Sequence, residues 1–121
     1  PDCLVVELGD GILGGYGVQS ILEDRELMAP AALHVLCATD PIAAWGAARL
    51  YRERFGLKLG VLSGPATDNS VGIEFIEREL GLPALNARQH ADELGAFIEE
   101  ALLKAGALAG AGAAARSASR S

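Results

Sequence analysis

Two carboxylates stand beside a cluster of glycines near the start of the sequence. Glu7 lies near the end of an apolar run, residues 3–8, and Asp10 follows within a glycine-rich segment. A carboxylate at the end of a buried strand can hold Mg²⁺ directly or through water, and the metal can bridge to nucleotide phosphates. Glycines let a phosphate or substrate approach the backbone closely. The predicted metal ligands are therefore Glu7 and Asp10, and the predicted cofactor-binding glycines are Gly9, Gly11 and Gly14.

The same segment permits other interpretations. Residues 9–14 match G-x-G-x-x-G, the dinucleotide fingerprint, which would make the chain an NAD-binding Rossmann half-domain. Against this, Glu7 and Asp10 place carboxylates where a pyrophosphate would lie, and the acidic residue expected about 20 positions later has no good candidate. A structural alternative has Asp10 in an Asx turn and Glu7 facing solvent or a partner.

Two further loops combine polar residues with an expected strand end. One follows the apolar run at 33–38, and the other follows the run at 57–63. Parallel sheets bind ligands at the carboxyl ends of their strands. Helix capping by Asp40, and by Asn69 or Ser70, is the structural alternative, and it is compatible with binding. The predicted binding residues in these two loops are Asp40, Thr67, Asp68 and Asn69.

Apolar runs alternate with helix-like stretches along the chain. Strands are expected at residues 3–8, 33–38, 57–63 and 82–87, and helices at about 18–28, at about 42–55, before Gly81, and along an apolar face from Leu94 to Ala105. Such alternation implies a parallel sheet with right-handed crossovers. The predicted fold class is α/β, with a parallel sheet of about four strands flanked by helices in a Rossmann-like layered architecture.

Composition and charge exclude several classes of protein. The 121 residues carry 10 Lys and Arg against 16 Asp and Glu, so a net charge of −6 makes the chain a poor binder of nucleic acid backbone. No run of about 18 apolar residues predicts a membrane span, and no signal peptide is recognised. Cys3 and Cys37 are interpreted as reduced core thiols, which predicts a cytoplasmic location. His34 and His90 show neither zinc-ligand spacing nor a nucleophile elbow nearby.

Four segments occur in an order shared with a known family. They are Leu4-Val5-Val6-Glu7-Leu8-Gly9-Asp10-Gly11, Thr39-Asp40-Pro41, Leu59-Gly60-Val61-Leu62-Ser63 and Leu80-Gly81-Leu82-Pro83-Ala84-Leu85. Across residues 3–90 this order resembles P-loop NTPases of the dethiobiotin synthetase, cobyrinic acid amide synthase and MinD-like type. The resemblance implies that Glu7 helps to place Mg²⁺ and phosphates. It also implies that a nucleobase or substrate is held after residue 63, where Thr67, Asp68 and Asn69 follow.

The defining motif of that family is missing from the sequence. There is no G-x-x-x-x-G-K-[ST], which supplies the phosphate cradle, the lysine and the Mg²⁺-binding hydroxyl. In addition, Ser63 stands where the family has Asn. The resemblance therefore implies a C-terminal half, with the phosphate-binding half upstream of Pro1 and with Mg²⁺ and ATP or GTP as cofactors. Alone, such a half should not hydrolyse a nucleotide.

These observations predict an organisation and a function. Residues 1–104 are expected to form an α/β domain that is part of a larger protein, and residues 105–121 an Ala/Gly/Ser-rich disordered tail. The expected partners are a nucleotide or other small molecule, with a second copy or an upstream domain covering an open sheet edge. The predicted function is that of a nucleotide-associated domain of a Mg²⁺-dependent P-loop-type ligase or NTPase. The alternatives are a non-catalytic module that binds a small anion or a protein, and the NAD-binding half-domain.

Overall fold

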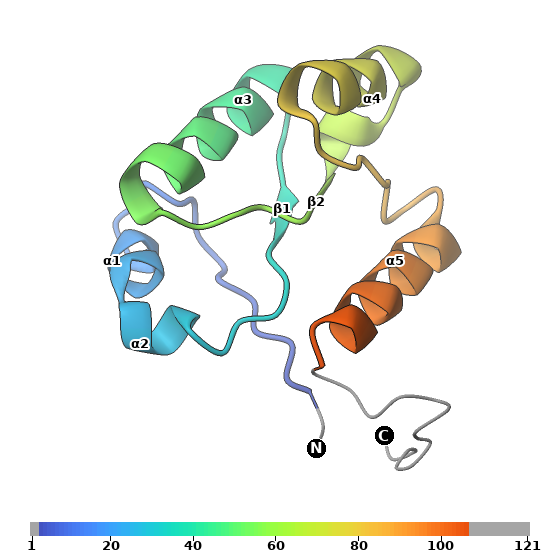
Figure 1. Ribbon diagram of the computed structural model, residues 1–121. Coiled ribbons are helices and arrows are strands. Elements are labelled where there is room, and N and C mark those ends of the chain that lie inside the picture. Colours follow the sequence, from blue (N-terminus) through green and yellow to red (C-terminus); the bar gives the residue numbers. More distant parts are fainter. Residues whose placement is uncertain (1–2, 107–121) are drawn as a thin grey trace. The chain divides into compact units, whose positions relative to one another are not determined.

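The computed structural model (Figure 1) describes residues 3–106. The chain divides into two compact units. Unit 1 comprises the described residues 3–32 and 97–106, and unit 2 comprises Leu33–Ala96. Helices and a small parallel sheet make up the described chain, so the mixed helix-and-strand class is confirmed. Of the predicted sheet of about four strands, the described residues form two.

Unit 2 is built around a parallel strand–helix–strand arrangement. Strand β1 (Val35–Cys37) lies beside β2 (Val61–Ser63) (Figure 1). The two strands pair in parallel, with Val35 opposite Val61. Every residue of β2 is buried, as expected for a parallel strand covered by helices. Helix α3 (Pro41–Leu50) connects the two strands and continues into a π-helical turn, η1 (Tyr51–Phe55). The predicted helix at about 42–55 is therefore confirmed.

The two helices that follow β1 and β2 begin and end where the sequence predicts. Asp40 caps α3, because its Oδ1 accepts a hydrogen bond from the Ala43 N–H at 2.8 Å. Asn69 caps α4 (Ser70–Phe75) in the same way, with 3.0 Å to the Gly72 N–H. Helix α4 continues into the π-helical turn η3 (Ile76–Leu80). Glycines with positive φ, 65° at Gly56 and 66° at Gly81, stop the two helices.

The core of unit 2 lies between its strands and helices. Leu62, Val61 and Ile76 are fully buried, and α3 packs against η3. Burial of such aliphatic side chains contributes about 1.5–3 kcal/mol each. The small residue Ala44 is also fully buried, on the inner face of α3.

The predicted fourth strand, residues 82–87, is reduced to one bridge. Leu62 donates its N–H to the Pro83 carbonyl and accepts from the Leu85 N–H, both at 2.9 Å, so Ala84 pairs with Leu62 in parallel. Proline has no N–H to continue a ladder, which limits strand formation at this point. The prediction of a strand over 82–87 is corrected to a single parallel bridge beside β2.

The predicted strand over residues 3–8 does not form in unit 1. Leu4, Val5 and Val6 are 73–95% exposed, and no residue of this run is in a strand. An extended run becomes a strand only by hydrogen bonding to a neighbouring strand, and the described residues of unit 1 contain none. The predicted burial of this run is likewise corrected.

The predicted helix at about 18–28 is divided in two. Helix α1 (Val18–Glu23) ends at Asp24, whose backbone is extended. Asp24 then caps α2 (Arg25–Met28), because its Oδ1 accepts from the Leu27 N–H at 3.0 Å. An internal Asp favours this break, since its side chain competes for backbone N–H groups.

Helix α5 (Ala91–Lys104) spans the boundary between the two units. It confirms the predicted amphipathic helix, with Leu94 buried. Asp92 and Glu93 lie in its first turn and Lys104 in its last, which favours the helix dipole. The predicted tail over 105–121 lies outside the described residues except for its first two positions.

A histidine and a tyrosine meet beside β1. Nδ1 of His34 lies 3.2 Å from the Tyr51 hydroxyl, and the two rings are in edge-to-face contact. Burial lowers the pKa of His34 below its ordinary value of 6.5, because the charged imidazole is poorly solvated there. A neutral imidazole can accept the hydroxyl proton at Nδ1, whereas a protonated one cannot.

This arrangement predicts a pH dependence of stability. The unfolded chain takes up a proton at His34 more readily than the folded chain. The contribution to stability is therefore complete above about pH 6.5 and is lost as the pH falls through the lowered folded-state pKa. Urea unfolding between pH 7.5 and 5 should show this loss in the wild type and a reduced loss in His34→Gln. The exposed His90 provides the matched control, His90→Gln, which should keep the wild-type profile; equal profiles in all three proteins would contradict the prediction.

Candidate functional site

The polar loop after β2 is held tightly against the end of β1. The loop, residues 64–68, contains the 3₁₀ turn η2 (Pro65–Thr67). The Ala66 N–H donates to the Ala38 carbonyl at 2.9 Å, and the Ala38 N–H donates to the Ser63 carbonyl at 3.1 Å. Gly64 has φ of 84°, and a Cβ at this position would lie 2.8 Å from the Ala38 carbonyl oxygen. Only glycine therefore fits where the loop leaves β2.

Asn86 locks this loop from the segment that precedes α5. It is 2% exposed. Its Nδ2 donates to Oγ1 of Thr67 at 2.9 Å and to Oδ1 of Asp68 at 2.8 Å. Its Oδ1 accepts from the N–H groups of Arg88 and Gln89 at 3.0 and 2.8 Å. Both polar atoms of the amide thus have two partners, and the side chain joins two segments of unit 2 that are far apart in sequence.

Ser63 and Gln89 strengthen the same connection. The Ser63 hydroxyl, fully buried at the end of β2, accepts from the Ala87 N–H at 2.9 Å. Nε2 of Gln89 donates to the Asp68 carbonyl at 3.3 Å. We call Ser63, Thr67, Asp68, Asn86 and Gln89 the strand-end network. Ser63 and Asn86 were not among the predicted site residues, although each is a polar residue at the end of an apolar run, which is the signal that could have identified them.

The four predicted binding residues of unit 2 lie in different environments. Thr67 is fully buried, donates to the Gly64 carbonyl at 2.7 Å and accepts from Asn86, so its hydroxyl shapes the loop. Asp68 is exposed, and Asn86 holds its carboxylate in place. Asp40 and Asn69 are exposed helix caps. Asp68 is therefore the residue of this loop best placed to bind a ligand, because its carboxylate is both exposed and held in position.

Asp10, in unit 1, carries an unsatisfied carboxylate oxygen. Its Oδ2 is buried, and no described residue hydrogen-bonds to it. The carboxylate lies against Gly14, where an added Cβ would collide with Oδ2. The Gly14 N–H donates to the Gly11 carbonyl at 2.9 Å and closes a turn. A larger residue at position 14 would therefore displace the Asp10 carboxylate from this place.

The remaining residues of this predicted site are open to solvent. Glu7, Gly9 and Gly11 are exposed, and a Cβ at either glycine would meet nothing within 4 Å. The predicted site residues are divided between the two units: Glu7, Gly9, Asp10, Gly11 and Gly14 belong to unit 1, and Asp40, Thr67, Asp68 and Asn69 to unit 2.

The carboxylates of Glu7 and Asp10 can be compared with the kinds of site in which proteins hold Mg²⁺. Within residues 3–106 no three His, Cys, Asp or Glu side chains gather as a metal site. Mg²⁺, however, is commonly held by one or two carboxylates together with waters and substrate phosphates. The free Oδ2 of Asp10 and the exposed carboxylate of Glu7 suit such a shared site and do not suit a closed protein cage.

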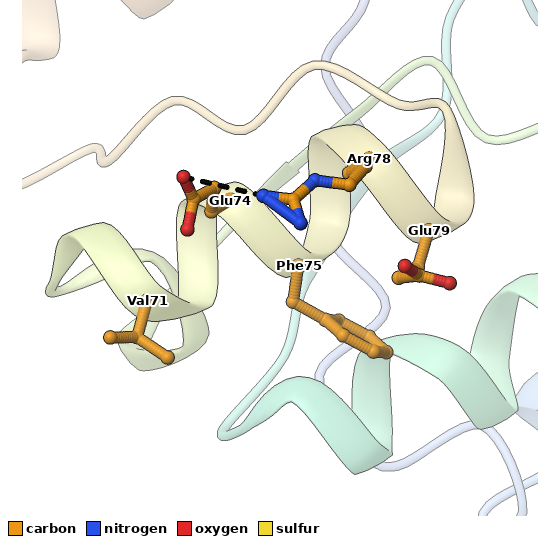
Figure 2. A pocket seen from close by; sticks show the side chains of 5 residues that line it. All are labelled: Val71, Glu74, Phe75, Arg78 and Glu79. Atoms are coloured by element: carbon orange, nitrogen blue, oxygen red, sulfur yellow. Dashed lines mark ion pairs between the residues drawn. The ribbon is translucent and has the colours of Figure 1, made fainter.

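A shallow hollow on α4 and η3 lies apart from these groups. Val71, Glu74, Phe75, Arg78 and Glu79 line it. Figure 2 shows Glu74 and Arg78 turned toward each other, and their ion pair measures 3.4 Å. Phe75 points away from this pair. The hollow contains none of the predicted site residues, and its single exposed ion pair offers no chemistry beyond a solvated helix face.

Comparisons with known proteins identify no relative of the chain. No protein-family model, no curated protein and no solved structure matches the chain. Within the described residues, no helix has the length and apolar character needed to cross a membrane.

Proposed function

We propose that the chain is a nucleotide-associated domain of a Mg²⁺-dependent P-loop-type ligase or NTPase, with ATP or GTP as the nucleotide. The observation that carries the proposal is the strand-end network, which holds the exposed carboxylate of Asp68 at the carboxyl end of β2. Ligands of parallel α/β sheets bind at this end of the strands. A fixed carboxylate there can accept hydrogen bonds from amino or ring N–H groups of a base.

The sheet that this function needs is larger than the described one. We infer that the complete sheet has about four strands in a Rossmann-like layer. Two observations support this: β1 pairs on one side alone among the described strands, and the bridge between Leu62 and Ala84 continues the parallel pairing beyond β2. An open strand edge leaves backbone N–H and C=O groups with which a further strand can pair.

The metal ion of the proposal is assigned to residues of unit 1. Asp10, with its unpartnered Oδ2, and Glu7 would hold the metal ion, and Gly14 leaves the space that the Asp10 carboxylate occupies. Bound Mg²⁺ neutralises phosphate charge and orients the phosphates. The lysine-bearing glycine loop that completes such a site has no counterpart in the sequence. Residues outside this chain would have to supply it, so we expect nucleotide binding without hydrolysis.

A nucleotide titration followed by amide NMR tests the proposal. MgATP or MgGTP should shift the signals of residues 39–41 and 63–69. Asp68→Asn keeps the oxygen that accepts from Asn86 but removes the charge, so it should weaken binding by about tenfold or more, the worth of a hydrogen bond to a charged group. Glu77→Gln, at an exposed carboxylate on η3, is the matched control and should leave the affinity unchanged.

Four outcomes would overturn the proposal. Shifts confined to other surfaces, or equal affinities of the wild type and Asp68→Asn, would remove the assigned role of the loop. A response to NADH without a response to ATP or GTP would favour the Rossmann half-domain. No response to any of these nucleotides would favour a module that binds a different small anion or a protein.

A further inference from the structure

The strand-end network uses its side-chain donors internally and presents an acceptor to solvent. The Asn86 amide donates to Oγ1 of Thr67 at 2.9 Å and to Oδ1 of Asp68 at 2.8 Å, which uses both of its hydrogens. The Thr67 hydroxyl donates its one hydrogen to the Gly64 carbonyl at 2.7 Å. The side-chain donors of Asn86 and Thr67 are thus fully used within unit 2, whereas the exposed carboxylate of Asp68 can only accept.

The Asp68 carboxylate keeps most of its capacity to accept hydrogen bonds. An ionised carboxylate offers about four lone-pair positions on its two oxygens, and Asn86 occupies one of them, on Oδ1. No other described residue hydrogen-bonds to this carboxylate. Oδ2 is therefore open to a ligand, and Oδ1 can accept a second bond. Because Asn86 is buried and held by four hydrogen bonds, its contact also restrains the rotation of the Asp68 carboxylate.

Two restrained acceptors select among nucleotide bases by the pattern of donors on the edge of the base. Guanine presents two adjacent donors, its N1–H and its 2-amino group, which match the two oxygens of one carboxylate. Adenine presents its 6-amino donor beside N1, which is itself an acceptor. If adenine bound in the same way, its N1 lone pair would face the second carboxylate oxygen. A carboxylate therefore gains two charge-assisted hydrogen bonds from guanine and one from adenine.

We propose that Asp68 makes the loop after β2 specific for guanine nucleotides. Guanine specificity rests on the proposed function, because it names the base of the nucleotide bound there. Both oxygens of Asp68 accept from the guanine edge, and Asn86 is the positioning residue that orients them. A hydrogen bond to a charged group is worth about tenfold in affinity, so GTP should bind at least about tenfold more tightly than ATP.

Isothermal titration calorimetry of the full chain with three nucleotides tests this specificity without any substitution. The nucleotides are GTP, ATP and inosine triphosphate (ITP), each with Mg²⁺. The base of ITP keeps the N1–H of guanine but lacks the 2-amino group, so it can make only one of the two bonds. GTP should bind most tightly, with ITP and ATP each weaker by about tenfold or more. If ITP or ATP bound as tightly as GTP, guanine specificity would be overturned while the proposed function would stand.

Two variants test whether the preference comes from Asp68. Asp68→Asn keeps an oxygen that accepts from Asn86 but turns the other acceptor into a donor, which would face the donors of guanine. The ratio of GTP to ATP affinity should therefore fall toward one. Glu77→Gln, at an exposed carboxylate on η3, is the matched control and should keep the wild-type ratio. A preference for GTP that persisted in Asp68→Asn would overturn the assignment, and a chain that bound none of the three nucleotides would overturn the proposed function as well.

Discussion

Gly64→Ala is expected to lower the free energy of unfolding by about 4 kcal/mol. Two costs add at this position. The backbone has φ of 84° and ψ of −175°, a region that side-chain-bearing residues avoid, at a cost of about 1–3 kcal/mol. The new Cβ would also lie 2.8 and 2.9 Å from the carbonyl oxygen and the nitrogen of Ala38, and relieving that contact costs about 1–3 kcal/mol more. Urea denaturation of the two proteins measures the difference.

Gly95→Ala is the matched control for this substitution. Gly95 lies within α5, and a Cβ there would meet nothing within 4 Å. Alanine should therefore stabilise the helix by about 0.5–1 kcal/mol. If both variants changed stability by less than about 1 kcal/mol, the close approach of the loop at Gly64 to the end of β1 would be wrong.

Asn86→Ala is expected to cost about 3 kcal/mol of stability and to disorder the loop that follows β2. The buried amide makes four hydrogen bonds, each with a net worth of about 0.5–1.5 kcal/mol. Its loss also frees the carboxylate of Asp68. Urea denaturation gives the stability, and amide hydrogen exchange of residues 64–68 reports the order of the loop. Gln89→Ala removes one exposed hydrogen bond of 3.3 Å and should cost less than about 0.5 kcal/mol.

A paired substitution distinguishes the hydrogen bond from the size of the side chain. Asn86→Asp places a second carboxylate against Asp68 and should destabilise the loop. Adding Asp68→Asn restores a donor and an acceptor with their positions exchanged, so part of the stability should return. If Asn86→Asp were as stable as the wild type, or if the double variant were the least stable protein, the assigned contact would be contradicted.

Local signals in the sequence predict the helices of unit 2 well, and for a physical reason. Capping is decided within four residues, so Asp40 could be identified as a cap, and the cap of α4 could be narrowed to Asn69 or Ser70, without knowledge of the fold. The stops at Gly56 and Gly81 are equally local, because they need only a residue that accepts positive φ. The break at Asp24 was missed, because an Asp inside a helical pattern is compatible with either outcome.

Strand predictions depend on partners, which a local pattern does not contain. The run at 3–8 has strand-forming residues, yet the described part of unit 1 offers it no strand to pair with. The run at 82–87 has a partner, β2, and is limited to one bridge beside Pro83. The hydrogen bonds of the strand-end network could not be predicted for the same reason. Asn86 contacts Thr67 and Asp68 only after β2 and the loop that follows it have formed.

The central claim is that the loop after β2 binds a nucleotide that carries a divalent metal ion. Paramagnetic Mn²⁺ in place of Mg²⁺ tests it directly, because the ion broadens the amide signals of nearby residues. With Mn²⁺ and ATP or GTP together, the signals of residues 63–69 should broaden, and Asp68→Asn should weaken the effect. No broadening at residues 63–69, or the same broadening with and without nucleotide, would contradict the claim.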